Sequence, residues 1–137
     1  MIYPPLKSSL TLQDRYFIAS ANSTAIAFPA DLVRDIIAFE RRQILVLPTY
    51  DSALLGIFYY QNEIVPAVCT KKVLNIAQNN LLQSNLVAIR LNESAGKLAN
   101  IALVVDRMEK SLAADELSSE YQFKLEDIPE KIWQPQY

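Results

Sequence analysis

The sequence contains no histidine, and only one of its 137 residues is a cysteine and two are glycines. Without an imidazole, histidine-based triads, phosphohistidine chemistry and histidine metal sites are excluded. With Gly56 and Gly96 alone, the chain has neither a phosphate-binding P-loop nor a dinucleotide fingerprint. Cys69 has no cysteine to pair with, and beside the apolar run 64–68 it is best interpreted as a small core residue. We expect no catalytic residue, no metal and no cofactor, and an enzyme is the least favoured class.

The chain also lacks a strong excess of either charge and a long apolar run. Its 13 lysines and arginines and 15 aspartates and glutamates leave a net charge of −2, so nucleic acid is not an expected partner. No run approaches the roughly 20 apolar residues that cross a bilayer, and residues 1–12 do not resemble a signal peptide. We therefore expect a cytoplasmic protein without direct membrane insertion.

The pattern along the chain divides it into three parts. Residues 1–14, with Pro4 and Pro5, are expected to form a flexible arm. Residues 15–108 are expected to form the folded core. Residues 109–137 are expected to pack on that core or to extend it.

Short β-rich runs separated by turn residues dominate the core. Residues 15–21 and 24–28 predict a hairpin around Asn22 and Ser23. Residues 31–40 have apolar positions at helical spacing but β-branched residues typical of a strand, and we favour a turn after Pro29 followed by a strand.

A second hairpin is predicted from the apolar segments 56–60 and 64–69, which flank a polar tip. Asn62 at this tip tolerates the left-handed backbone of a tight turn. Because neither segment alternates apolar with polar residues, both faces are expected to be covered. Tyr59 and Tyr60 point to opposite faces of their strand, so at most one can lie at a partner surface, and we favour the core for both.

A further strand is predicted at 86–91. Another is predicted within 98–108, where the apolar run 101–105 forms its centre and Asp106 marks its end. A last strand is predicted at 121–125. Many short strands with regular turns indicate an all-β barrel or sandwich.

Three blocks in this order resemble the CheW family of chemotaxis adaptors. The first is Phe28-Pro29 followed by Val33, Asp35, Ile36 and Ile37, which is similar to the family's Val-x-Glu-Ile-like strand. The second is Leu47-Pro48 and then 56–68, where Gly56 and Pro66 keep the places of the family's Gly-Val-x-Asn-Leu-Arg-Gly-x-Val-Val-Pro-Val block. The third is the strand 86–91, Gly96 and the run 103–106 ending in Val-Asp.

The resemblance implies a fold of two intertwined, small, five-stranded β-barrels of SH3-like form. It also implies a non-catalytic scaffold that links the cytoplasmic tip of a chemoreceptor to the regulatory domain of a CheA-type histidine kinase. The family's receptor contacts correspond to Val33, Gln61 and Val87, and its kinase contacts to Asp35 and Gly56.

Two departures from the family pattern leave alternatives open. The family's Arg-Gly at the hairpin tip is Gln61-Asn62 here, which removes a charged donor and indicates a divergent receptor, as in pilus-based motility or taxis. The family's last strands are mostly absent from the pattern after Asp106, which leaves an incomplete first barrel as one alternative. Its open edge would then be covered by 121–125 or by a second copy of the chain. The alternative function is accordingly a structural protein that self-associates through an open β edge.

Overall fold

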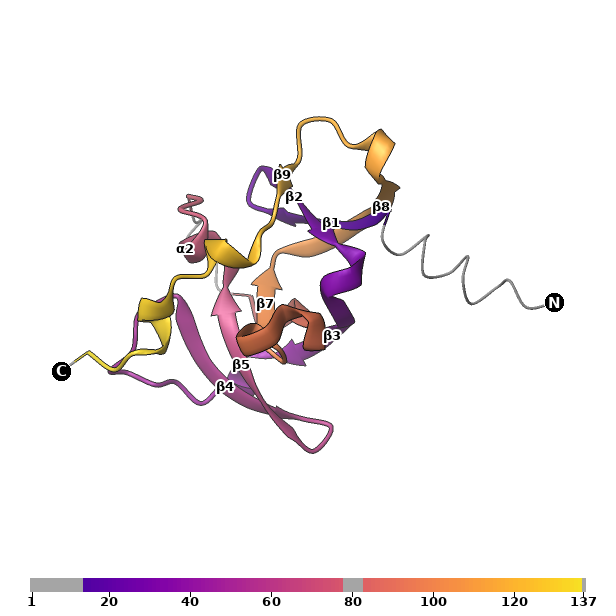
Figure 1. Cartoon of the computed structure of the whole chain (residues 1–137). Coiled ribbons are helices and arrows are strands. Elements are labelled where there is room, and N and C mark those ends of the chain that lie inside the picture. Colours follow the sequence, from indigo (N-terminus) through magenta and orange to yellow (C-terminus); the bar gives the residue numbers. More distant parts are fainter. Residues whose placement is uncertain (1–13, 78–82, 137) are drawn as a thin grey trace.

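The computed structural model describes residues 14–77 and 83–136, and these form a mostly β protein (Figure 1). The all-β prediction is confirmed. The strands are β1 (Arg15–Ala21), β2 (Thr24–Pro29), β3 (Val33–Glu40), β4 (Leu54–Tyr60), β5 (Glu63–Cys69), β6 (Asn85–Leu91), β7 (Ala102–Val105), β8 (Arg107–Ala113) and β9 (Tyr121–Gln122). Short helical turns connect them: η1 (Ala30–Leu32), η2 (Arg41–Gln43), α2 (Thr70–Val73), η3 (Glu93–Leu98), η4 (Ala114–Glu116), η5 (Leu125–Asp127) and η6 (Glu130–Trp133). The predicted flexible arm lies, except for Asp14, outside the described residues.

The strands form two sheets. The first has four strands in the order β8-β1-β2-β9, and the second has five strands in the order β3-β6-β7-β5-β4. Figure 1 shows the first sheet above the second, with β7 running on into β8 from one sheet to the other. The chain therefore enters the second sheet after β2 and returns to the first through β8.

The predicted N-terminal hairpin and the strand after Pro29 are both confirmed. β1 pairs with β2 in antiparallel register from Tyr16 opposite Pro29 to Ala21 opposite Thr24. Asn22 in the turn has a positive φ of 58°, a conformation that asparagine tolerates better than most residues. After the single turn η1, β3 pairs with β6 along its whole length, which resolves the helix-or-strand ambiguity of 31–40 in favour of the strand.

The segment after Asp106 contributes more to the fold than its sequence suggests. The expected strand 98–108 is shorter, since η3 precedes β7 and a separate strand, β8, begins at Arg107. β8 spans position 108 and pairs with β1, so the folded core continues past that position. β9 is also shorter than the predicted 121–125, and it lies parallel to β2 at Ile26 and Ala27. The edge of β2 is thus covered at these positions by the chain itself.

The second sheet has a buried cluster of its own. The second sheet curls so that Phe39 on β3 and Phe58 on β4 stack with ring centroids 4.1 Å apart, although these strands lie at opposite ends of the strand order. Around this stack lies a small core that includes Val65 and Ala88. The second sheet is therefore rolled into a barrel whose inner face holds this core.

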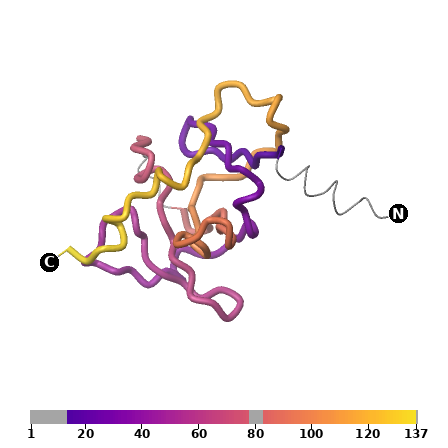
Figure 2. The backbone as a smooth tube through the Cα atoms, viewed as in Figure 1, coloured from indigo at the N-terminus to yellow at the C-terminus, as the bar shows by residue number. Residues whose placement is uncertain are grey.

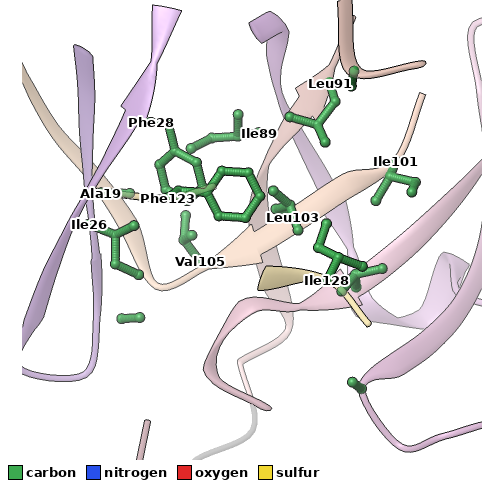
Figure 3. Close-up of a cluster of buried hydrophobic side chains, with 14 of the residues drawn as sticks. Ala19, Ile26, Phe28, Ile89, Leu91, Ile101, Leu103, Val105, Phe123 and Ile128 are labelled. Carbon is green, nitrogen blue, oxygen red and sulfur yellow. The ribbon is translucent and has the colours of Figure 1, made fainter. Parts of the chain in front are cut away.

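A larger core lies between the two sheets (Figure 3). Phe28 from β2 and Phe123 after β9 meet with ring centroids 5.1 Å apart. The C-terminal segment adds Ile128 and Ile132, both buried, and it runs from the first sheet down along the second, as the yellow tube in Figure 2 shows. This segment therefore ties the two sheets together.

Candidate functional site

A buried arginine occupies an apolar strand of the second barrel. Arg90 belongs to β6, whose neighbouring residues Ile89 and Leu91 are both buried, and the Arg90 side chain is 1 % exposed. Asp35 lies directly opposite on β3 and accepts hydrogen bonds from Arg90 Nε at 2.9 Å and Nη2 at 2.6 Å. Arg90 Nη1 also donates to Asn100 Oδ1 at 3.4 Å. A buried guanidinium requires such partners, because an unpaired charge in the interior is strongly destabilising.

A second ion pair lies beside the first and joins strands that share no backbone hydrogen bonds. Arg34 on β3 donates to Glu63 on β5 from Nη1 at 3.1 Å and from Nη2 at 2.6 Å. Glu63 Oε2 also lies 3.6 Å from Arg90 Nη1. The Arg90 guanidinium carbon is 5.2 Å from the centre of the Tyr60 ring, a cation–π distance. Two arginines and two carboxylates therefore form one cluster at the mouth of the second barrel.

The ionised carboxylates of this cluster are favoured by their arginine partners. Hydrogen bonds from Arg90 lower the pKa of Asp35 below its ordinary value. Hydrogen bonds from Arg34 lower the pKa of Glu63, and the same contact raises the pKa of Arg34. Asp35, Glu63 and Arg34 are thus favoured in their charged forms.

The β4–β5 hairpin ends in a two-residue turn next to this cluster. Gln61 and Asn62 both have positive φ, 46° and 67°, as in a type I′ turn. The second predicted hairpin and the left-handed conformation of Asn62 are confirmed. Both turn side chains are exposed, so Gln61 is presented to solvent at the tip.

The outer face of this hairpin is apolar and uncovered. Leu45, Tyr59 and Ile64 are 63 %, 63 % and 61 % exposed, and we call these three residues the hairpin face. Tyr59 lies opposite Ile64, and Leu45 forms an isolated bridge to Ile57 two residues before Tyr59, so their side chains point to the same side. The predictions that both faces of the hairpin are covered and that Tyr59 is a core residue are therefore wrong. A continuous apolar run signals burial only when a second layer is present, and nothing in the described residues forms one here.

A second apolar surface lies along β3. Val33, Ile36 and Ala38 face the same side of the sheet as Val87, which is opposite Ala38 on β6, and we call these four residues the β3 strip. Ile36 is 41 % exposed and Ala38 is exposed, whereas Val33 and Val87 are half-buried against the larger core. The strip is therefore exposed at Ile36 and Ala38 and partly covered at Val33 and Val87.

The model of the CheW-like domain matches residues 15–134 of the chain. The chain belongs to the CheW-like domain family. A crystal structure of the scaffolding protein TtCheW from Thermoanaerobacter tengcongensis is similar, with a TM-score of 0.59 and 16 % identity over 76 % of this chain and 67 % of that chain. This likeness confirms the fold of two barrel-like β units. No curated protein matches the chain.

Membership in the CheW-like family supports a chemotaxis adaptor role in general, and adaptors of this family are non-catalytic. Within 14–77 and 83–136, no group of three metal-ligating side chains lies together. No helix of these residues is long and apolar enough to span a membrane. What the described surface offers chemically is apolar contact area, a charged cluster and an exposed amide at the hairpin tip.

The residues that the CheW-like resemblance assigns to receptor contact occupy two places. Val33 and Val87 both belong to the β3 strip, although Val33 lies opposite Leu91 and Val87 lies opposite Ala38, near the other end of the ladder. Gln61 is apart from them at the hairpin tip. The structure thus brings the two valines onto one face and leaves Gln61 beside the charged cluster.

The two residues assigned to kinase contact are not free surface residues. Asp35 is engaged by Arg90, with 36 % of its side chain exposed. Gly56 is buried, has a φ of 145°, and a Cβ at this position would lie 2.2 Å from the carbonyl oxygen of Leu45. Glycine here lets the chain at Leu45 approach β4 and form its bridge to Ile57.

Arg90, Glu63 and the hairpin face were missed by sequence reasoning. The sequence did offer one signal for Arg90, which stands in the apolar run Leu-Val-Ala-Ile-Arg-Leu. An arginine buried in such a strand needs a carboxylate partner, so this run indicates a buried ion pair. No sequence signal identifies Glu63 as that partner, since the contact depends on how the barrel closes.

Proposed function

We propose that this CheW-like chain couples the cytoplasmic tip of a chemoreceptor to the regulatory domain of a CheA-type histidine kinase. An adaptor that joins two proteins needs two docking surfaces, and exposed apolar side chains are typical of such surfaces. The observation that carries the proposal is a pair of apolar surfaces with exposed side chains, the β3 strip at Ile36 and Ala38 and the hairpin face.

We assign the β3 strip and the hairpin tip to the receptor. Val33 and Val87 lie within the strip, and Ile36 provides its large exposed apolar side chain. Gln61 would present a neutral amide to the receptor in place of the family's charged arginine. A receptor of a divergent system, as in pilus-based motility or taxis, fits this difference.

We assign the hairpin face to the kinase. Gly56 is covered by the chain at Leu45, so a partner that senses Gly56 would contact Leu45 and the exposed side chains beside it. Asp35 would act through Arg90, which holds the same barrel in shape. In this proposal, the surface over Gly56 binds the partner and Gly56 itself shapes that surface.

Two matched substitutions test the assignment. Ile36→Asp and Ile64→Asp place the same charge on exposed strand isoleucines of the two surfaces. Binding of the full chain to a receptor cytoplasmic fragment and to a kinase regulatory domain is measured by calorimetry. We expect Ile36→Asp to weaken receptor binding by about tenfold or more and to spare the kinase, and Ile64→Asp to do the reverse.

The outcomes separate the parts of the proposal. Binding of neither partner by the unmodified chain would contradict the adaptor role. Equal effects of both substitutions on both partners would leave the adaptor role and overturn the assignment of surfaces. Self-association stays a prediction as well, and light scattering at high concentration tests it; β9 already covers β2 at the positions where a second copy was considered.

A further inference from the structure

The end of the β4–β5 hairpin extends beyond the strands that support it. β5 pairs with β7 only from Ala67 to Cys69, so the part of β5 between Glu63 and Pro66 has β4 as its ladder partner. In this part of β5, the backbone carbonyl of Ile64 also accepts a hydrogen bond from the Asn100 side chain at 3.0 Å. Figure 1 shows this hairpin projecting from the second barrel, at the bottom of the view. An isolated two-stranded hairpin is marginally stable in water, so this overhang needs other support.

The second barrel is closed by side chains at this end. β3 and β4 are at opposite ends of the strand order, and no backbone ladder joins them in the described part of the chain. The stacked rings of Phe39 and Phe58 bridge the seam inside the barrel. At the mouth, the bridging contacts are those of Glu63 with Arg34 and Arg90, and of Tyr60 with Arg90.

Glu63 connects the hairpin to two strands at once. It is the first residue after the turn, and its carboxylate accepts two hydrogen bonds from Arg34 on β3 while lying 3.6 Å from Arg90 on β6. We infer that Glu63 is a latch residue, which with Arg34 closes the mouth of the second barrel and holds the hairpin tip in one position. Side chains outside the turn therefore contribute to the geometry of the tip, in addition to the hydrogen bond that Tyr59 donates to Asn62 Oδ1 within the hairpin.

The two arginines differ in how firmly they are held. Arg90 is buried and fixed by Asp35, so it offers Glu63 a rigid charge. Arg34 lies at an irregularity of β3, where the register shifts between Val33 and Asp35, and such bulges redirect side chains. Its two-nitrogen contact with Glu63 has the paired geometry that lysine does not reproduce.

The consequence for binding rests on the proposed function. If Gln61 contacts a receptor, the latch fixes the position of Gln61 before the receptor arrives. Pre-positioning lowers the ordering cost of binding. Glu63 and Arg34 are positioning residues in this scheme, since they act through the hairpin tip.

Amide hydrogen exchange of the free full chain tests the latch without any partner. We expect Glu63→Gln to accelerate exchange of the hairpin amides between 58 and 65 by about fivefold or more relative to core amides of β6 and β7. Glu63→Asp keeps the charge and is expected to retain part of the protection. Glu109→Gln is the matched control, because Glu109 is an exposed glutamate paired with Arg107 at 2.6 Å, two residues away on the same strand. It is expected to leave the hairpin amides unchanged.

Two results would overturn the latch. One is exchange of the hairpin amides in Glu63→Gln that stays within about twofold of the unmodified chain. The other is acceleration of hairpin and core amides by the same factor, which would mean that Glu63 stabilises the whole fold and positions nothing. Failure to bind a receptor or kinase would contradict the proposed function and leave the exchange result unaffected, so the two failures are distinguishable.

Discussion

Asp35 accepts two hydrogen bonds from the guanidinium of Arg90, at 2.9 Å from Nε and 2.6 Å from Nη2, and the Arg90 side chain is 1 % exposed. The residue that family resemblance assigns to kinase contact is therefore also an internal partner of the second barrel. Substitutions at Asp35 have two possible consequences, loss of a contact with a partner and loss of support for Arg90. Stability measurements separate them.

We expect Asp35→Asn to destabilise the protein by about 1–2 kcal/mol, because the amide keeps one acceptor for Arg90 and loses the charge. This cost is smaller than that of breaking a fully buried ion pair, because Asp35 is partly exposed to solvent, which screens its interaction with Arg90. Urea unfolding followed by tryptophan fluorescence measures the change. Asp115→Asn, at an exposed aspartate, is the control and is expected to leave the midpoint unchanged. Reduced kinase binding with unaltered stability would show instead that Asp35 contacts the partner directly.

The same pair predicts how stability depends on pH. The pKa of Asp35 is lowered in the folded protein by its hydrogen bonds with Arg90, so its contribution is complete above the ordinary value of 3.8 and is lost as the pH falls below it. We expect the unmodified chain to lose more stability than Asp35→Asn between neutral pH and about pH 3. Urea midpoints measured across this range provide the comparison. Parallel curves for the two proteins would contradict the assignment.

Substitution of Gly56 is expected to change stability, at a position that the family resemblance assigns to kinase binding. Alanine would place a Cβ 2.2 Å from the Leu45 carbonyl oxygen and 2.7 Å from Ile44 Cγ2, at a φ of 145°. We expect Gly56→Ala to cost about 2–4 kcal/mol from backbone strain and the displaced bridge between Leu45 and Ile57. Thermal unfolding measures the cost, and Ala99→Ser, at a half-buried alanine after η3, provides a mild control. A Gly56→Ala protein of unchanged stability that fails to bind the kinase would point to direct contact at Gly56.

The sequence was informative where local chemistry decides structure. The hairpins around Asn22 and Asn62 were predictable because polar residues that tolerate positive φ separate apolar β-rich segments. The strand β3 was predictable from its β-branched residues and the proline before it. The family resemblance then supplied the pairing of two barrels, which short strands alone do not specify.

Long-range contacts account for what was not predictable. β8 was missed because its segment Arg-Met-Glu-Lys-Ser-Leu-Ala is mostly polar, and its strand conformation depends on pairing with β1, far away in the sequence. The exposure of Tyr59 and Ile64 was missed because an apolar run does not show whether a second layer covers it. Likewise, the contact of Glu63 with Arg34 depends on how the barrel curls.

The hairpin tip yields a prediction in which stability and binding change in opposite directions. Gln61 has a φ of 46°, a left-handed conformation in which asparagine is several-fold more frequent than most other residues. We expect Gln61→Asn to stabilise the protein by about 0.5–1 kcal/mol, because it lowers the strain of a type I′ turn. If Gln61 also contacts the receptor, the shorter side chain should weaken that binding, since it withdraws the amide by one methylene.

Urea unfolding and receptor binding of the same preparation test both halves of this prediction. Gln134→Asn is the matched control, because Gln134 is an exposed glutamine with a negative φ of −103°, where asparagine offers no advantage. A stability gain without a binding loss would indicate that the tip is set by turn geometry alone and that Gln61 does not contact the receptor. A stability loss in Gln61→Asn would contradict the strain argument, because the long 3.5 Å hydrogen bond from Gln61 Nε2 to the Tyr60 hydroxyl is the interaction that the shorter side chain gives up, while the backbone change favours the left-handed conformation that the turn requires.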